Sequence, residues 1–423
     1  MTTTTSGAHP VRTPRPRIDY LDAARALAII GMLLAHIAAF IPLPDFVLNL
    51  VSGRSAIVFA VLAGVSTTLI ARSGAVTEHE RLGYTNAYSS RNLFVRGIIL
   101  FVLGITLPLI SVGPIIILAT YSVLYLLAIP VLRLRTRYVA GLTAVTAFVA
   151  PVLSFWIRST WPNTGDEIVI GGVPSIASFT SLEGTGQAIR QLLVDGMYPV
   201  LTWIPFLLAG IVIGRLIISG TFTARLSATA GLILAIVGYG TSWVLTNVTD
   251  VISGRVAPYR EFDPALAHAS DDKLLDIYGA IVYADFGVTN TNDPKSLLFA
   301  SHHSGSITEI IGGIGFALLL LAGLSLLERV AAPVLAPVNN LGRMALTYYV
   351  AHIVGFLAVV LIGGGEYSLW IFLVVFIVIP MIFAAVWFRF FRRGPLEAVM
   401  YSAARRASGP RPARQEDKVP AKA

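Results

Sequence analysis

The chain has 423 residues, of which 55% are hydrophobic and 13% are charged, and its mean hydropathy is +0.75. Soluble globular domains carry roughly 25% charged residues, so this composition excludes an ordinary soluble protein and indicates a membrane protein. No cysteine is present, which excludes disulfides, thiolate metal sites and cysteine nucleophiles. The net charge of +8 is compatible with a nucleic-acid partner, but the distribution of the basic residues argues against one.

Ten apolar segments follow one another along the chain, each long enough for a bilayer core, which needs about 20 residues. We expect spanning helices over residues 20–41, 46–71, 92–110, 114–132, 138–157, 198–218, 226–246, 306–327, 340–363 and 367–391. The flanking segments 1–17 and 398–423 are polar and basic, and we expect both to be disordered tails. The sequence therefore predicts an all-α, polytopic membrane helix bundle within residues 18–397.

The basic residues predict the orientation of this bundle. With both termini in the cytoplasm, 23 of the 31 Lys and Arg residues lie in cytoplasmic segments or at the adjoining helix ends, and only 6 lie outside. Cytoplasmic loops of membrane proteins carry such an excess. The positive charge therefore indicates membrane topology, and we expect a lipid bilayer rather than a nucleic acid as partner.

Two loops predicted to lie outside are long, at roughly 158–197 and 247–305. Loops of this length are uncommon unless they are functional or disordered. The second loop is acidic and contains Asp250, Glu261, Asp263, Asp271, Asp272, Asp276, Asp285 and Asp293. Two interpretations stay open: a solvated cap, and a lid or acceptor-binding surface over the bundle.

The first predicted helix carries three polar residues on one face. At 100° per residue, the eleven steps from Arg25 to His36 return to within about 20° and rise roughly 16 Å. Asp22 lies three residues before Arg25 and shares that face. Polar groups in hydrocarbon are costly, so they mark either function or a buried pair. The stripe is either a structural Asp22–Arg25 ion pair with a packing histidine, or part of a functional site.

Further candidates lie at the predicted outer side and in a later helix. Arg54 is near the outer end of the second span, and His303 begins the segment "HSGSITE" with Glu309. His303 and Glu309 either face an acceptor, or Glu309 and a nearby serine cap the helix. His352 lies in "TYYVAHIVG", where it is either catalytic or satisfied by the hydroxyl of Thr347 or Tyr348. No HExxH or similar ligand spacing occurs, so we expect no metal site.

Acyl transfer needs a base and, for a thioester donor, cations that hold its phosphates. Imidazole suits the first task near neutral pH. Arginines at the cytoplasmic face suit the second. Arg25, Arg91, Arg96 and Arg343 are candidates for this role, although each is alternatively a positive-inside anchor.

Six motifs in chain order extend from Leu21 to Glu397. They read "LDAARALAIIGMLLAH", "SGRSAIVFAVLAG", "YPVLTWIPFLLAGIVIGR", "HSGSITEIIGGIGFA", "GRMALTYYVAH" and "FRRGPLE". With them the chain resembles the bacterial heparan-α-glucosaminide N-acetyltransferase-like membrane proteins, many of unknown function. The arginine, ten residues, histidine spacing is also similar to the first helix of family-three acyltransferases, which O-acylate cell-surface glycans.

The resemblance implies an acyltransferase of the bacterial plasma membrane. Its donor would be acetyl-CoA or another acyl-CoA taken from the cytoplasm, with no permanently bound cofactor. Its acceptor would be a hydroxyl or amine of an envelope glycan or lipid-linked sugar. In this picture His36 is the base or a transient acyl carrier, Asp22 holds Arg25, and Arg25 holds donor phosphates.

Two positions depart from that branch. Ala26 replaces a usual glycine, and His36 stands where asparagine is usual. The proposed catalytic histidine of the mammalian lysosomal enzyme lies in the outer loop after the first helix, and here the corresponding "IPLPDF" has none. The role therefore falls to His36, as in the family-three enzymes, or to another histidine, His303 or His352.

Two other classes of function fit intramembrane charges on physical grounds. One is a transporter or flippase for a small acid or lipid, although the internal repeats and broken helices of many transporters are not clear here. The other is a non-catalytic subunit of an envelope complex. The sequence also leaves open whether the chain acts alone or as a homodimer.

Overall fold

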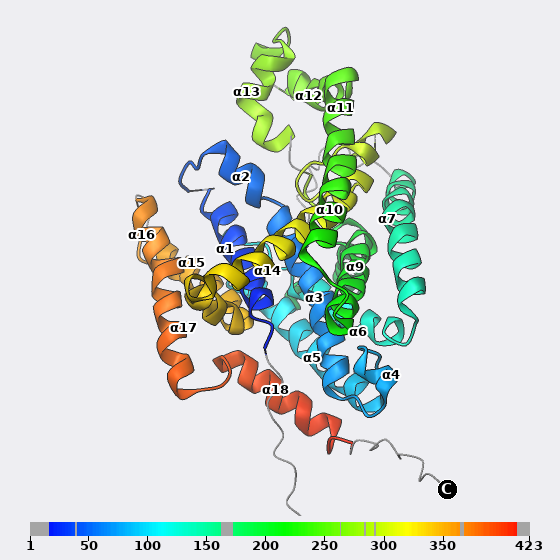
Figure 1. Cartoon of the computed structure of the whole chain (residues 1–423). Helices are drawn as coiled ribbons and strands as arrows, with labels where there is room; N and C mark the ends of the chain where they lie inside the picture. The colour runs from blue at the N-terminus through cyan, green and yellow to red at the C-terminus, as the bar shows by residue number, and fades with distance from the viewer. Residues whose placement is uncertain are drawn as a thin grey trace, which may run out of the picture.

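The computed structural model is a bundle of helices with a small helical cap at one end. It describes residues 17–38, 40–161, 172–262, 264–282, 285–291, 293–363 and 368–412. The cap holds α12 (Val251–Phe262) and α13 (Asp271–Val282), and the opposite end of the bundle holds α4 (Glu78–Arg81) and α18 (Pro395–Ser408) (Figure 1).

Eight helical stretches in the described chain are long and apolar enough to cross a membrane. They are α1 (Asp19–Ile37), α2 with α3 (Asp45–Val51, Arg54–Ser73), α5 with η1 (Ala87–Thr106, Leu107–Leu109), α7 (Thr136–Ser159), α9 (Val200–Ser219), α10 with η4 and α11 (Ala224–Ala235, Ile236–Gly240, Thr241–Val248), α14 (Ile307–Arg343), and α16 with η7 and α17 (Leu369–Leu373, Val374–Val378, Ile379–Phe390). Two further apolar helices are shorter, α6 (Leu118–Val131) and α15 (Ala345–Leu361).

These ten stretches coincide with the ten predicted spans, and the predicted all-α membrane bundle is confirmed. The number of ten crossings stays a prediction, because α6 has only 14 residues where about 20 are usual. The orientation also stays a prediction.

The first helices of the bundle pack closely because small residues face one another. A Cβ atom on Gly64 of α3 would lie 2.2 Å from the carbonyl oxygen of Leu207 in α9, and one on Gly210 would lie 2.0 Å from that of Val61. Because lipid is as apolar as the helix surfaces, the hydrophobic effect does not drive helices together in a membrane. Close packing of this kind therefore supplies much of the free energy of helix association. Helices α1 and α14 pack beside this pair, and together they form the buried centre of the bundle.

Two predicted spans differ in detail from the structure. The predicted helix over 46–71 is divided into α2 and α3 at Gly53, whose φ of +68° is costly for residues with a side chain. The predicted break between 327 and 340 corresponds to a kink at Ala331, whose φ of −144° and ψ of 39° are not helical, although a second helical segment of α14 then continues to Arg343. Pro333 and Pro337 follow this kink, and proline disrupts helical geometry on its N-terminal side.

The two long loops contain structure of their own. Residues 158–197 include η2 (Ile176–Thr180), α8 (Leu182–Arg190) and η3 (Gln191–Asp195), while 162–171 lie outside the described residues. The loop over 247–305 folds into α12, η5 (Pro264–Leu266), α13 and η6 (Pro294–Leu298). Val256, Leu266, Leu274 and Val282 give this cap its own apolar core.

The predicted disordered tail from residue 398 begins too early. Residues 395–408 form α18, which packs against α5 and α15. Met400, Ala404 and Ser408 are buried at four-residue spacing, so one face of α18 covers the bundle. Residues 413–423 and 1–16, where we also expected disorder, lie outside the described residues.

Candidate functional site

The structure brings together three histidines that lie far apart in the sequence. His36 near the end of α1 stacks on His352 of α15, with ring centroids 6.2 Å apart and 7° between the ring planes. His303, in the loop before α14, packs edge-on against Tyr198 at 5.5 Å and is near enough to His36 and His302 for protonation of either to lower its pKa. The three sequence alternatives for a base are therefore neighbours in one cluster.

Glu309 shapes the loop that presents His303. Its Oε1 accepts the backbone N–H of His303 at 2.7 Å, and its Oε2 accepts that of Gly305 at 2.7 Å and the hydroxyl of Ser304 at 3.1 Å. Ser306 caps α14 by accepting the backbone N–H of Glu309. His303 has a φ of 63°, and its Nδ1 is buried without a hydrogen-bond partner among the described residues. Glu309 thus acts on the backbone of the loop, and the imidazole of His303 keeps a free nitrogen.

Arg54 lies beside this loop. It begins α3, and its guanidinium carbon is 4.6 Å from the ring centroid of Tyr239, which lies in the π-helical turn η4. A Cβ atom on the preceding Gly53 would lie 3.3 Å from the backbone nitrogen of His303. The start of α3 therefore packs directly on the histidine loop. π-Helical turns are frequent at functional sites.

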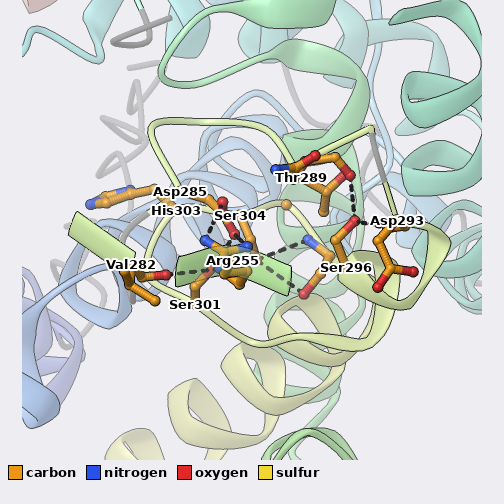
Figure 2. A network of polar contacts seen from close by, with 12 residues as sticks. Arg255, Val282, Asp285, Thr289, Asp293, Ser296, Ser301, His303 and Ser304 are labelled. Atoms are coloured by element: carbon orange, nitrogen blue, oxygen red, sulfur yellow. Dashed lines mark hydrogen bonds and ion pairs between the residues drawn. The ribbon is translucent and has the colours of Figure 1, made fainter. Parts of the chain in front are cut away.

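The cap is bound to the same loop through Asp285. Arg255 of α12 donates to both carboxylate oxygens of Asp285, at 2.8 and 3.3 Å, and to the carbonyl oxygen of Val282 (Figure 2). Ser301 also donates to Asp285, and the backbone N–H of Asp285 donates to the carbonyl of His302 at 3.1 Å. Asp250 and Asp271 pair with Lys295 and Arg260. The acidic loop is thus a folded cap held against the histidines, with several acidic side chains paired internally.

Asp22 and Arg25, on the polar face of α1, belong to an ion-pair network at the opposite end of that helix from His36. Asp22 is buried and accepts from both Arg17 and Arg25. Arg25 also donates to the hydroxyl of Ser66 in α3 at 3.1 Å. Asp22 therefore fixes the guanidinium of Arg25 while leaving its charge at the edge of a cavity.

This cavity has a volume of about 240 Å³ and runs into the bundle. Arg17, Arg25, Arg96 and Arg343 contribute its charged lining, together with Glu397. Tyr121, Tyr125 and Tyr349 line it as well. The ring of Tyr349 packs edge-on against His352 at 5.1 Å, so Tyr349 connects the lining of the cavity with the histidine cluster.

A second cavity of about 440 Å³ lies beside α18 and shares Arg96 with the first. Glu397 holds α18 in place, because it accepts the backbone N–H groups of Leu346 and Thr347 and the Thr347 hydroxyl at 2.7–3.2 Å. The carboxylate thereby satisfies N–H groups at the start of α15, which lack partners within the helix. This contact gives Glu397, the last residue of the "FRRGPLE" motif, a structural role.

Most predicted site residues gather at these places. Arg25, Arg96 and Arg343 line the first cavity, whereas Arg91 is exposed and lines neither of the two. The suggestion that the hydroxyl of Thr347 or Tyr348 satisfies His352 is wrong, since the Thr347 hydroxyl donates to Glu397 and the Tyr348 hydroxyl to the carbonyl of Phe376. Among the described residues, no three His, Cys, Asp or Glu side chains are placed to hold a metal ion.

The tyrosines and the side chains of α18 are not among the site residues predicted from the sequence. Tyr121 and Tyr125 are four residues apart in "TYSVLYL", which places both on one helix face, and this spacing could have identified them. Arg393, Tyr401 and Arg405 line the second cavity. We expected the segment after 397 to be disordered, so its side chains were assigned no site.

We expect acid to loosen the histidine loop. Burial lowers the pKa of His303 to about 3, helped by His302 and His36, and burial together with Arg54 lowers that of His302 to about 4. An unfolded histidine titrates near 6.5. Below that pH the unfolded chain binds more protons than the folded loop does, so the free energy of unfolding falls. The thermal midpoint of the purified protein should drop as pH falls from 7 towards 4.5.

The matched variant is His303→Asn, because asparagine tolerates a positive φ better than most side chains. Its midpoint should depend less steeply on pH over this window. An unchanged slope in both His303→Asn and His302→Asn would contradict this origin of the acid sensitivity.

Comparisons with known families agree with this architecture. Residues 17–244 match the family described as heparan-alpha-glucosaminide N-acetyltransferase, catalytic, and residues 268–407 match a family described as protein of unknown function (DUF418). No curated protein and no solved structure matches the chain. The first match covers α1 to α10 and more than half of the chain. The chain therefore belongs to the family of heparan-α-glucosaminide N-acetyltransferase catalytic domains, and is a multi-pass membrane protein of acetyltransferase type.

Proposed function

We propose that this chain moves an acetyl or other acyl group from cytoplasmic acyl-CoA to a hydroxyl or amine of an envelope glycan or lipid-linked sugar. One observation carries the proposal: the arginine-lined cavity and the histidine cluster share Tyr349, which lines the first and contacts the second. Donor and acceptor could then meet at the histidines from opposite ends of the bundle. Membership of the acetyltransferase family supports the reaction class.

The donor would enter at the end that holds Arg25, Arg96 and Arg343. This end carries the excess of basic residues typical of the cytoplasmic side of a bacterial plasma membrane. Guanidinium groups suit phosphate because they make paired, charge-assisted hydrogen bonds. The pantetheine arm would extend past Tyr121 and Tyr349, over about the 16 Å that separates Arg25 from His36 along α1.

The transfer itself needs a proton acceptor beside the thioester carbonyl. The acceptor oxygen or nitrogen attacks that carbonyl carbon and gives its proton to an imidazole, then the C–S bond breaks and the CoA thiolate takes up the proton. His36 suits the base because it stacks on His352, lies near His303 and is only partly buried.

The acceptor would reach the cluster beneath the cap. Arg54 and the loop held by Glu309 lie on this side, next to His303. The direct test of the whole proposal is release of CoA from acetyl-CoA by the purified protein. A transporter or a non-catalytic subunit should not turn over a thioester, so absence of turnover with every acyl-CoA and acceptor tried would favour those alternatives.

The orientation can be tested because the chain has no native cysteine. Ser270 is exposed at the start of α13 in the cap. A cysteine at Ser270 should react with an impermeant thiol reagent in intact cells, since the cap is proposed to lie outside. A cysteine at the exposed Glu78 of α4, at the opposite end, should react only after permeabilisation. The reverse pattern would invert the proposed topology and the side from which the donor comes.

A further inference from the structure

The second cavity has the composition of an anion site beside aromatic rings. Its lining is Ile70, Ser73, Tyr88, Asn92, Arg96, Arg393, Tyr401, Arg405 and Arg411. The four arginines come from two parts of the chain, α5 and the segment 391–412, which follows α17 and includes α18. Among the residues that the structure describes, no carboxylate lines the cavity.

The charges in this cavity are not neutralised by the described chain. None of the four arginines forms an ion pair among the described residues. Arg96 donates to the amide oxygen of Asn92 at 2.8 Å, and the guanidinium of Arg393 lies 3.5 Å from the ring centroid of Tyr401. Four guanidinium groups gathered without an acid favour an anionic ligand, and phosphate is the anion whose geometry they match best.

Arg96 connects this cavity with the first one, since it lines both. A ligand in the second cavity is therefore adjacent to the mouth that holds Arg25 and Arg343. Acyl-CoA has a matching layout: a thioester arm, a diphosphate, and an adenosine that carries a separate 3′-phosphate. With the arm in the first cavity, the diphosphate would lie near Arg96 and the nucleoside in the second cavity.

We propose that the second cavity binds the 3′-phosphorylated adenosine of the donor, with Arg393 and Arg405 on the 3′-phosphate and Tyr88 and Tyr401 beside the adenine. This inference rests on the proposed function and adds a specificity to it. The chain selects CoA over dephospho-CoA, and it does so through α18. The region that matches a family of unknown function thereby completes the donor site.

The test compares two double variants that remove the same charge from the same helix end. Arg393→Gln with Arg405→Gln removes two guanidinium groups from the cavity. Arg392→Gln with Arg406→Gln removes the exposed neighbours of those residues, which do not line it. Affinity for CoA and for dephospho-CoA is measured by calorimetry, with the protein in nanodiscs of uncharged lipid.

The wild type and the control variant should bind CoA at least about tenfold more tightly than dephospho-CoA, the size expected for a charge-assisted phosphate contact. The cavity variant should lose this preference by weakening CoA alone. Adenosine 3′,5′-bisphosphate should compete with CoA in the wild type and much less in the cavity variant.

Equal affinity for CoA and dephospho-CoA in the wild type overturns this inference and leaves the proposed function standing. So does a preference that survives in the cavity variant. If the wild type binds neither CoA nor dephospho-CoA, both this inference and the proposed function are overturned. An anionic lipid headgroup uses the same guanidinium chemistry. If phosphatidylglycerol in the protein's own nanodisc weakened CoA binding as effectively as the bisphosphate does, the cavity would be assigned to lipid instead.

Discussion

Replacing His36 with alanine is expected to lower kcat roughly 10²–10⁴-fold and to leave the KM for the donor nearly unchanged. General acid–base help is typically worth that factor, and the loss appears in kcat because proton transfer occurs in the transition state. Donor binding should persist, since Arg25, which lines the cavity, is about three helical turns away from His36 along α1. The measurement is steady-state turnover of acetyl-CoA with saturating acceptor.

His36→Asn is the sharper form of this experiment, because asparagine keeps a polar side chain of similar size but cannot take the proton. His79→Ala is the matched control, since His79 stacks on Tyr84 near α4 and has no part in the cluster. Full activity of His36→Asn would exclude His36 as the base. The role would then pass to His303 first and to His352 second, both of which lie in the same cluster.

Features set by local spacing could be predicted from the sequence. The ten apolar stretches follow from composition, and the Asp22–Arg25 pair follows from a three-residue step on one helix. The capping of α14 by Ser306 is likewise a local pattern. In each case the residues that interact are neighbours in the chain, so helix periodicity alone brings them together.

Contacts between distant helices could not be predicted in this way. Periodicity shows that His36 and Arg25 share a face, but it does not tell which helix that face meets. The contact between His36 and His352 depends on how α15 packs against α1. Arg393 and Arg96 line one cavity because α18 packs against α5. The spacing of Tyr121 and Tyr125 places both on one face of α6, but that this face lines a cavity depends on which helices it meets.

Glu397 illustrates how a local reading can fail. In the sequence it is a single acid before a basic, polar segment, a pattern typical of a solvated tail. In the structure its carboxylate receives three hydrogen bonds from the start of α15, and this contact orders a helix that composition alone leaves unstructured. A carboxylate at a helix N-terminus also gains from the helix dipole.

Replacing Arg25 with alanine is the second change with a large expected effect. It should raise the KM for acyl-CoA about ten- to a hundredfold and change the acceptor KM much less. A lost charge-assisted hydrogen bond costs about 1.5–3 kcal/mol, which corresponds to that factor. Arg25 is suited to this contact because Asp22 and Ser66 hold its guanidinium at the edge of the first cavity. Initial-rate kinetics with each substrate varied in turn separate the two KM values.

Arg91→Ala is the matched control for Arg25→Ala, because it removes one positive charge from an exposed position that lines neither cavity. A general loss of surface potential would affect both variants, whereas a phosphate contact would affect only Arg25→Ala. An unchanged donor KM together with a greatly raised acceptor KM would move Arg25 to the acceptor. Loss of folded protein would instead assign Arg25 to stability, because its removal leaves Asp22 buried with Arg17 as its remaining partner, and a buried charge that loses a partner is strongly destabilising.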